Sequence, residues 1–295
     1  MTTKLCKGIV LLTALVALSG CAAVALTTVN TLMPPFNGQS VHDVAYGDEP
    51  RQRLDLYCPL KPDPELPLVV FIYGGAWQFG ERSQYRWAAE SLANMGYYTA
   101  IPDYRLFPEV HFPEFIYDVE ASIPKALRSC RDLHGCATDE VILVAHSSGA
   151  HTAAMLAMDP AYFAGQEVKI IGWVGLSGPY DFLPLRNKLE DIFPPSIPPN
   201  LTQPIYFVSP DDPPALLIHG KDDTRVYPEN SQNLGQALED AGVPVTVQFH
   251  SETRHAAILF ALSGRVLKDI AVRDSIQQFL ECLHHQPAAR QLCIQ

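Results

Sequence analysis

The sequence contains no cluster of basic residues and has few charged residues overall. Charged residues make up 18% of the 295-residue chain, and the formal net charge at pH 7 is −11. Nucleic acids and anionic membrane surfaces attract proteins through concentrated positive charge, so we expect neither as a partner. A solvated acidic surface is sufficient to account for the charge.

Metal-binding spacings are also missing. Neither C-x-x-C nor H-x-x-x-H occurs among the cysteines and histidines, although zinc sites commonly use such spacings. We therefore expect no bound metal. No internal repeat is evident, and a chain of this length with 47% hydrophobic residues can bury one large core. The composition is that of a single globular domain.

The N-terminus has the pattern of an export signal. Lys4 and Lys7 precede an apolar run over 8–18, and the tetrapeptide L-S-G-C ends at Cys21. This tetrapeptide resembles the bacterial lipobox, in which the cysteine is lipidated and becomes the mature N-terminus. The resemblance implies a signal peptide over 1–20, a polar tether over 21–40 and a membrane-anchored lipoprotein of the cell envelope.

An uncleaved transmembrane anchor is the alternative interpretation of the N-terminus. No charged residue occurs between Gly8 and Val41, and the run over 8–26 just reaches the length needed to span a bilayer. Ser19 and Gly20 interrupt this run at the expected cleavage point, which favours the lipoprotein.

Export would place the domain where disulfides persist. Cys6 would be removed with the signal peptide and Cys21 would carry the lipid, which leaves five cysteines in the domain. The pairs Cys130/Cys136 and Cys282/Cys293 are close enough in sequence to bridge helix ends, which leaves Cys58 without a partner. The sequence leaves this connectivity open.

From residue 41 to 295 the pattern alternates between apolar β-type runs and helical spacing, which predicts an α/β fold with a mostly parallel sheet and helices on both faces. Strands are expected over 53–57 (half-exposed), 68–72, 97–101, 141–144, 170–175, 215–218 and 243–249, and helices over 83–95, 115–128, 150–157, 229–241, from 255, and over 271–283. A proline-rich, lid-like insertion covers about 178–213. Its apolar residues could line a substrate pocket or pack on the domain.

The segment 141–154 predicts a nucleophile. A short β-branched strand runs into Ala145-His146-Ser147-Ser148-Gly149, and an alanine-rich helix follows. A sharp strand-turn-helix elbow needs small residues two positions on either side of its serine. Ala145 and Gly149 meet this need for Ser147, whereas Ser148 does not have a small residue at each offset. Ser147 is therefore the expected nucleophile, and the N–H of Ser148 is an expected oxyanion donor.

A second segment, Tyr73-Gly74-Gly75-Ala76-Trp77, follows the strand over 68–72. Two glycines at this point allow the backbone to approach another group closely. Given a nucleophile elsewhere, we expect an oxyanion loop that presents the N–H groups of Gly75 and Ala76. Trp77 and Tyr73 are expected to line the substrate pocket.

A serine hydroxyl needs a base within hydrogen-bond reach. The loops after the carboxyl ends of parallel strands share one sheet edge, where Ser147 lies. Asp223 follows the strand over 215–218 and His255 follows the last strand, which predicts a Ser147–His255–Asp223 triad. Asp222 is the alternative acid, and His250, His146 and His151 are the alternative bases. Asp103, Arg105 and Asp118 are expected to have structural roles.

These residues together resemble the α/β-hydrolase carboxylesterases, a group that includes hormone-sensitive-lipase-like, feruloyl-esterase-like and kynurenine-formamidase-like enzymes. The motifs are Y-G-G-A-W (73–77), P-D-Y-R-L-F-P-E (102–109), A-H-S-S-G-A-H (145–151), S-G-P-Y-D (177–181), P-P-A-L-L-I-H-G-K-D-D-T-R-V (213–226) and T-R-H-A-A-I-L (253–259). The family pattern has histidine in place of Tyr73 and glycine in place of Ala145. Neither change removes a catalytic atom, and the family's acid aligns on Asp223.

The resemblance implies a serine hydrolase that cleaves a small-molecule carboxylic ester through an acyl-enzyme, without metal or organic cofactor. Two alternatives remain open. One is an amidase such as an arylformamidase, which would use the same triad. The other is an inactive envelope protein that retains the fold.

Overall fold

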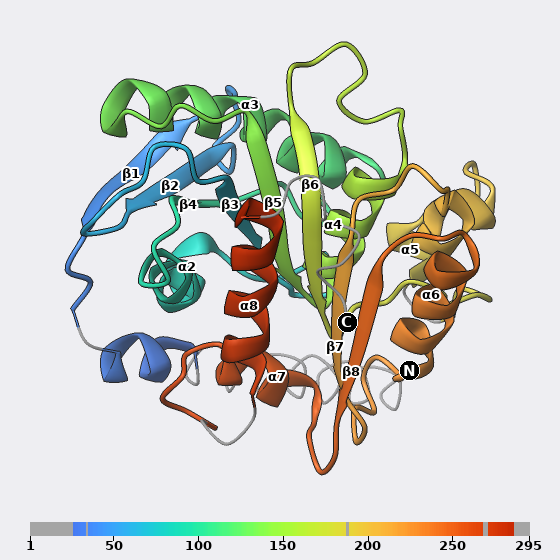
Figure 1. Ribbon diagram of the computed structural model, residues 1–295. Coiled ribbons are helices and arrows are strands. Elements are labelled where there is room, and N and C mark those ends of the chain that lie inside the picture. Colours follow the sequence, from blue (N-terminus) through green and yellow to red (C-terminus); the bar gives the residue numbers. More distant parts are fainter. Residues whose placement is uncertain (1–25, 34, 187–188, 268–270, 286–295) are drawn as a thin grey trace, which may run out of the picture.

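The computed structural model describes residues 26–33, 35–186, 189–267 and 271–285. Its centre is one eight-stranded sheet with the order β1-β2-β4-β3-β5-β6-β7-β8 (Figure 1). The strands are β1 Gln39–Ala45, β2 Arg53–Cys58, β3 Leu68–Ile72, β4 Thr99–Pro102, β5 Glu140–His146, β6 Lys169–Leu176, β7 Ala215–Gly220 and β8 Val245–His250. The β1/β2 and β2/β4 pairs are antiparallel and all other pairs are parallel. The mostly parallel α/β sheet expected from the sequence is confirmed.

Helices cover both faces of this sheet (Figure 1). They are α2 Arg86–Ala93, α3 Glu114–His134, α4 Ser148–Met158, α5 Leu189–Ile192, α6 Glu229–Asp240, α7 His255–Ala261 and α8 Val272–His285, with short 3₁₀ turns η1 Arg82–Tyr85, η2 Pro199–Thr202 and η3 Pro204–Phe207. Helices α2, α7 and α8 pack on one face, and α3, α4 and α6 on the other. The central strands β3 and β5 are consequently buried on both sides, which explains their unbroken apolar runs.

The antiparallel edge differs from the sequence expectation in two ways. β2 was expected to be half-exposed, but Asp55 and Tyr57 are buried as well as the alternating leucines, because α2 and α3 both reach this strand. β1 was not predicted at all. Its residues are mostly exposed and show no apolar alternation, so it forms a strand only because β2 offers it hydrogen bonds.

The segment before β1 also differs from the polar tether that the sequence predicted. Residues 26–32 are helical, and Leu26 and Val29 are buried against the domain. Asn30 donates its side-chain amide to the carbonyls of Ser83 and Gln84 and accepts the N–H of Trp87. This part of the chain is therefore packed against the η1 turn and α2.

Several other elements have slightly different bounds. The helix expected over 83–95 is divided into η1 and α2, and the helix expected over 115–128 continues to His134. Gly135 ends it with φ 75°, a left-handed conformation that favours glycine. The insertion contains α5, η2 and η3. Within it Ile192 and Phe193 are buried in the core, whereas Tyr206 is 60% exposed.

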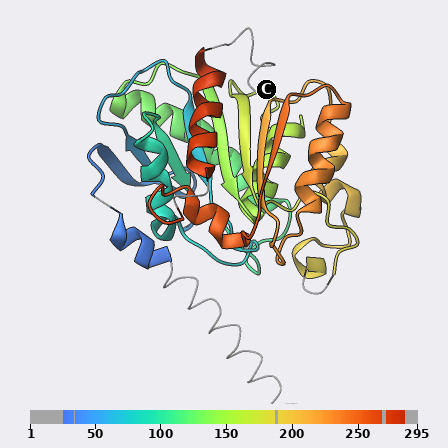
Figure 2. The same cartoon turned by 60° about the horizontal axis from the view of Figure 1, so that its bottom comes forward.

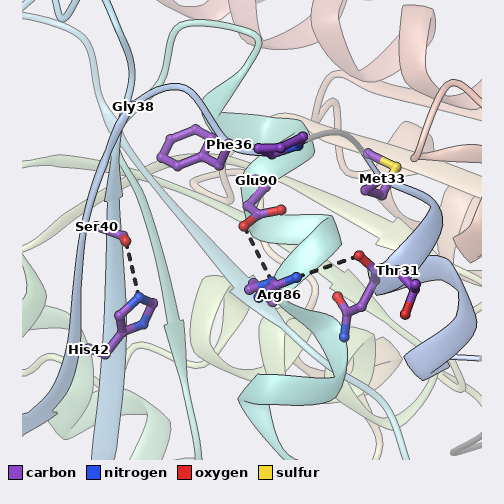
Figure 3. A pocket seen from close by; sticks show the side chains of 10 residues that line it. Thr31, Met33, Phe36, Gly38, Ser40, His42, Arg86 and Glu90 are labelled. Atoms are coloured by element: carbon purple, nitrogen blue, oxygen red, sulfur yellow. Dashed lines mark hydrogen bonds and ion pairs between the residues drawn. The ribbon is translucent and has the colours of Figure 1, made fainter.

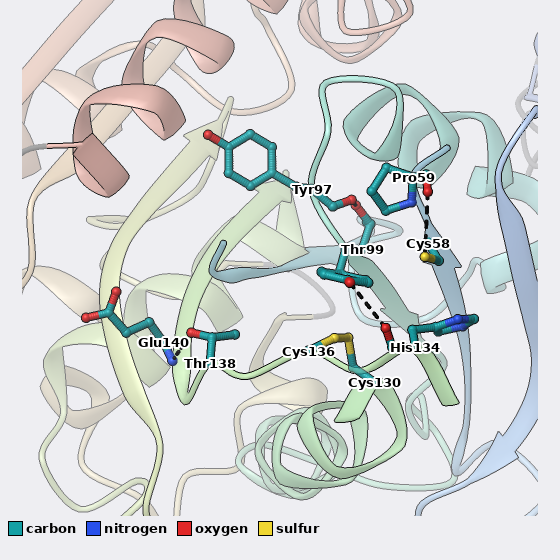
Figure 4. The surroundings of a disulfide bond; sticks show 10 residues. Cys58, Pro59, Tyr97, Thr99, Cys130, His134, Cys136, Thr138 and Glu140 are labelled. Atoms are coloured by element: carbon teal, nitrogen blue, oxygen red, sulfur yellow. Dashed lines mark hydrogen bonds between the residues drawn. A yellow bond between two sulfur atoms is a disulfide. The ribbon is translucent and has the colours of Figure 1, made fainter. Parts of the chain in front are cut away.

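One predicted disulfide is present. Cys130 and Cys136 are bonded and join the end of α3 to the segment that enters β5 (Figure 4). Cys58 is a buried free thiol. Cys293 lies outside the described residues, and so do the expected signal peptide and Cys21. Within the described ranges, no helix is both long and apolar enough to cross a membrane.

Candidate active site

Ser147 lies at the turn between β5 and α4, on the sheet edge where the parallel strands end. Its φ of 55° and ψ of −126° are strained for a serine, as the elbow requires. The N–H of Ser147 donates to the carbonyl of Leu176 at 2.9 Å, which ties the turn to β6. A side chain at Gly149 would lie 2.3 Å from the carbonyl oxygen of Ile72. Glycine is therefore required there, whereas the site of Ala145 accommodates a methyl group.

Three residues from separate loops meet at this edge. The Nε2 atom of His255 lies 2.9 Å from the Oγ of Ser147, and its Nδ1 lies 2.7 Å from the Oδ2 of Asp223. Asp223 follows β7, and His255 is the first residue of α7, which lies along the same edge (Figures 1 and 2). The structure thus brings together the three side chains that the sequence predicted.

The carboxylate of Asp223 is enclosed by hydrogen-bond donors. Its Oδ1 accepts the N–H groups of Arg225 and Val226 at 2.9 and 3.0 Å. Burial of Asp223 opposes its ionisation, but hydrogen bonds from His219 and His255 outweigh burial and lower its pKa. Asp223 therefore stays ionised at neutral pH. Asp222, the alternative acid, is exposed, and its N–H donates to the carbonyl of Thr253.

Two of the alternative bases, His146 and His151, have other partners. The Nε2 of His146 faces the carbonyl of His255 at 3.3 Å, and the two rings lie 4.8 Å apart. The Nε2 of His151 faces the carbonyl of Thr202 at 2.9 Å. Burial lowers the pKa of His146, of His250 and of His151, the last to about 4. Of the four histidines considered, only His255 has its imidazole within hydrogen-bond distance of the Oγ of Ser147.

The loop that the sequence predicted to bind an oxyanion follows β3, but the N–H of one expected donor is already used. The N–H of Gly75 donates to the side-chain Oγ of Ser148 at 3.0 Å. The carbonyl of Gly75 accepts the N–H groups of Gln78 and Phe79, which turns the N–H of Ala76 to the opposite side. Ala76 has φ 53°, and no acceptor among the described residues engages its N–H. The available donors are therefore Ala76 and the N–H of Ser148 in the first turn of α4.

Three side chains hold the carbonyls of this loop from behind. Tyr104 donates to the carbonyl of Tyr73 at 2.7 Å, Tyr85 to that of Gly74 at 3.1 Å, and Arg51 to that of Gly80 at 2.7 Å. Burial raises the pKa of Tyr85 to about 12, so its hydroxyl remains a donor. These supports were not predicted from the sequence, because no local motif links them to the loop.

Tyr73 supports the loop and does not line a pocket, contrary to the sequence expectation. Its ring is fully buried between those of Tyr85 and Tyr104, at 5.1 and 4.8 Å. Its hydroxyl donates to Asp103 at 2.7 Å and accepts a hydrogen bond from Arg51 at 3.0 Å. Burial raises the pKa of Tyr73 well above its usual value, so the hydroxyl stays protonated.

Asp103 and Asp118 have contacts that fit the structural roles expected for them. Asp103 also accepts the backbone N–H of Arg82 at 2.7 Å and pairs with its guanidinium. Arg105 forms a two-pronged ion pair with buried Asp118 at 2.8 and 2.7 Å. Both carboxylates therefore hold the segment after β4 beneath the oxyanion loop.

Trp77 lies in an aromatic cluster beside the elbow. Its ring contacts Phe193 and His151 edge-on, with centroids 4.9 and 5.2 Å apart, and Phe182 at 6.1 Å. Trp77 is only 4% exposed, whereas Phe182 is half-buried. The insertion thus supplies both core residues and a partly accessible aromatic ring close to Trp77.

A separate cavity of about 530 Å³ lies between α2 and the segments 30–33 and 35–42 (Figure 3). None of the triad residues lines it. Arg86 in its wall is paired with Glu90 at 3.4 Å and contacts the carbonyl of Asn30. No group of three or more His, Cys, Asp or Glu side chains in the described part of the chain is arranged to hold a metal ion.

Comparisons with known proteins agree with this arrangement. The BD-FAE family matches residues 54–196, which include the elbow, and the prolyl oligopeptidase family matches residues 199–284, which include Asp223 and His255. A probable isoprenylcysteine alpha-carbonyl methylesterase from Oryza sativa subsp. japonica is 27% identical over 82% of this chain and 64% of its own length. A kynurenine formamidase from Danio rerio is 26% identical over 75% of this chain and 76% of its own.

The chain spans 64%, 50% and 62% of the lengths of three plant methylesterase relatives. Among solved structures, esterase B from Lactobacillus rhamnosis inhibited by a tributyrin phosphonate has a TM-score of 0.80 at 20% identity. The likeness covers 97% of this chain and 98% of the esterase. At this identity it shows a shared fold.

Proposed function

We propose that this chain, which belongs to the α/β-hydrolases as its motifs predicted, hydrolyses carboxylic esters through an acyl-enzyme formed on Ser147. One observation carries the proposal: an unbroken series of contacts from Asp223 through His255 to the Oγ of Ser147, at 2.7 and 2.9 Å. The esterase names of several relatives, and the phosphonate-inhibited esterase that shares the fold, support the same reaction class.

The first step would be attack on the ester carbonyl. His255 accepts the hydroxyl proton of Ser147 at Nε2 while the Oγ forms the bond to carbon. Asp223 holds the Nδ1 proton of His255, which fixes the tautomer whose Nε2 is a free base. Because its pKa is lowered, Asp223 remains a carboxylate and stabilises the imidazolium that forms.

The negative charge on the substrate oxygen would be stabilised by the N–H groups of Ala76 and Ser148. Both are backbone donors whose orientation is fixed before substrate arrives, so little reorganisation is needed during the reaction. His255 then gives its proton to the leaving alcohol, and the acyl-enzyme remains on Ser147. Water repeats the sequence with the same base, which releases the acid and restores the serine.

Amide hydrolysis is the second candidate, since the kynurenine formamidase relative is matched over three quarters of its length. The same His255 could protonate an amine leaving group. Comparison of kcat/KM for p-nitrophenyl esters and N-formyl anilides distinguishes the two. A higher value for the esters supports the proposed function, and a higher value for the anilides supports the amidase.

The test of the nucleophile is Ser147→Ala with p-nitrophenyl butyrate as substrate. We expect turnover to fall to background while the melting temperature stays close to that of the wild type. Ser122→Ala, which removes a buried hydroxyl from α3, serves as the control and should keep full activity. A fluorophosphonate probe should label the wild type and the control but not Ser147→Ala. Turnover by Ser147→Ala, or an unlabelled wild type, would contradict the proposal.

A further inference from the structure

A second histidine faces the carboxylate of Asp223 from the protein interior. His219, the second-last residue of β7, is fully buried, and its Nε2 lies 3.3 Å from the Oδ2 of Asp223. The same nitrogen lies 3.0 Å from the carbonyl oxygen of Val226. Its Nδ1 lies 2.7 Å from the Oγ of Ser231 on α6. Its contact with Asp223 lowers the pKa of that carboxyl, but the proposed reaction assigns no proton transfer to this imidazole.

The surroundings of His219 determine where its proton lies. Nε2 faces a carboxylate and a carbonyl, which are both acceptors, so a lone pair there would be repelled by two oxygens. The hydroxyl of Ser231 can donate to Nδ1, which leaves the proton on Nε2. Nε2 is therefore a donor toward Asp223 and Val226 in either charge state of the ring.

The loop that carries Asp223 is wrapped around this ring. It leaves β7 one residue after His219 and enters α6 two residues before Ser231, which is also fully buried. Its backbone is joined to the loop before His255, since Asp222 donates its N–H to the carbonyl of Thr253 at 3.0 Å. A shift of the His219 ring would therefore move the carboxylate relative to His255.

We propose that His219, oriented by Ser231, is a positioning residue that holds the Asp223 carboxylate for His255 and withdraws part of its negative charge. The inference rests on the proposed function, because it concerns the same triad. Two imidazoles share one carboxylate oxygen, one as the base and one as a fixed donor. The fixed donor reduces the stabilisation that Asp223 gives to imidazolium on His255, so His255 is more readily found as the neutral base.

Loss of the His219 hydrogen-bond donor should change the pH dependence of activity in one direction. Without the Nε2 hydrogen of His219, Asp223 would attract the Nδ1 proton of His255 more strongly. The acid limb of the kcat/KM profile should therefore move to higher pH, by about half a unit to one unit. Disorder of the carboxylate should also lower kcat by roughly tenfold, the lower end of the range for loss of an outer hydrogen-bond partner.

Other titratable groups around His255 are few. Asp223 faces it from the loop after β7, and His146 faces it from β5 with its ring 4.8 Å away. Burial lowers the pKa of His146 well below its usual value, so it remains neutral through the assay range. A shift of the profile in a His219 variant is therefore attributable to the change at Asp223.

The experiment compares His219→Met, which has no donor, with His219→Gln, whose side-chain amide can present an N–H near the Nε2 position. His134→Met, at the far end of α3, is the matched control. Full pH profiles of kcat and KM with p-nitrophenyl butyrate are measured for each, with thermal melting and fluorophosphonate labelling to count folded sites. We expect His219→Met to move the acid limb of the kcat/KM profile to higher pH and to lower kcat, with KM unchanged. His219→Gln should restore most of the wild-type pH profile and most of the lost kcat.

Ser231→Ala keeps the inference testable if His219→Met does not fold. Removal of this hydroxyl frees the ring to rotate, so we expect a smaller shift in the same direction and a several-fold lower kcat. Ser122→Ala is its control. Two results would overturn this inference and leave the proposed function intact. One is that His219 and Ser231 variants that still label with fluorophosphonate have the same pH profiles as the wild type. The other is that His219→Gln does not reverse the shift seen in His219→Met. An unlabelled and inactive wild type would instead overturn the proposed function, and the inference with it.

Discussion

Ser147 is supported differently on its two sides. On one side, the loops after β7 and β8 bring an ionised carboxylate and an imidazole, which contact each other and the serine directly. On the other side, the loop after β3 brings backbone N–H groups, and no side chain of that loop contacts the serine through a hydrogen bond among the described residues. The first side depends on charge and the second on the orientation of peptide planes.

This difference explains which parts of the site tolerate departures from the family pattern. In the proposed reaction Asp223 and His255 act through their own side-chain atoms, so the reaction would fix their identity. The loop after β3 would act through its backbone, so its side chains can change if another group holds the peptides in place. Tyr73 illustrates this: it replaces a histidine, yet it is fully buried and bonded to Asp103.

The largest effect is expected on the charged side. Asp223→Asn keeps the shape of the acid but removes its charge and can stabilise the wrong tautomer of His255. We expect kcat to fall by roughly 10⁴, measured with p-nitrophenyl butyrate under saturating substrate. Asp222→Asn changes the neighbouring, exposed acid and should leave kcat close to that of the wild type. Equal losses in both variants would show that the acid has been assigned to the wrong position.

A smaller effect is expected on the backbone side. Tyr85→Phe removes the hydroxyl that holds the carbonyl of Gly74 and thereby the peptide plane of Gly75. Since loss of a whole oxyanion donor costs 10²–10³ in kcat, we expect loss of one support to cost about tenfold, with little change in KM. Tyr117→Phe, on an exposed ring of α3, is the control. A larger loss for Tyr85→Phe than for Asp223→Asn would reverse the comparison between the two sides.

The smallest effect on activity is expected at His151, which packs against Trp77 of the oxyanion loop. Burial lowers the pKa of His151 to about 4, so between pH 6.5 and pH 4 the unfolded chain binds a proton that the folded chain does not. This histidine therefore lowers stability as the pH falls through that window, by up to about 1.4 kcal/mol per pH unit.

His151→Gln tests this effect, because the amide can still donate to the carbonyl of Thr202 but does not titrate. We expect its melting temperature to fall less steeply than that of the wild type between pH 6.5 and pH 4, while kcat at pH 7.5 changes little. Parallel melting curves over that window would show that His151 does not contribute to acid sensitivity.

The structure was predicted most accurately from the sequence in segments whose local residue pattern matches their tertiary environment. The strand and helix around Ser147 were found because an apolar run, small residues and alanines occur in consecutive order. β1 and the helix over 26–32 were missed because their order depends on partners elsewhere: β2 for the strand, and η1 with α2 for the helix. The expectation for Gly75 failed for the same reason, since only the fold brings the hydroxyl of Ser148 to its N–H.

The sequence alone determined the kinds of atoms available for chemistry and their order along the chain: a hydroxyl at Ser147, a carboxylate at Asp223 and an imidazole at His255. Strand periodicity placed each of them after a parallel strand, and therefore at one edge of the sheet. The tertiary structure decided which backbone donors remain free and which distant side chains, such as Arg51, Tyr85, Tyr104 and His219, hold the site in shape. These depend on the directions of peptide planes and buried rings, which are set by packing between segments far apart in the chain.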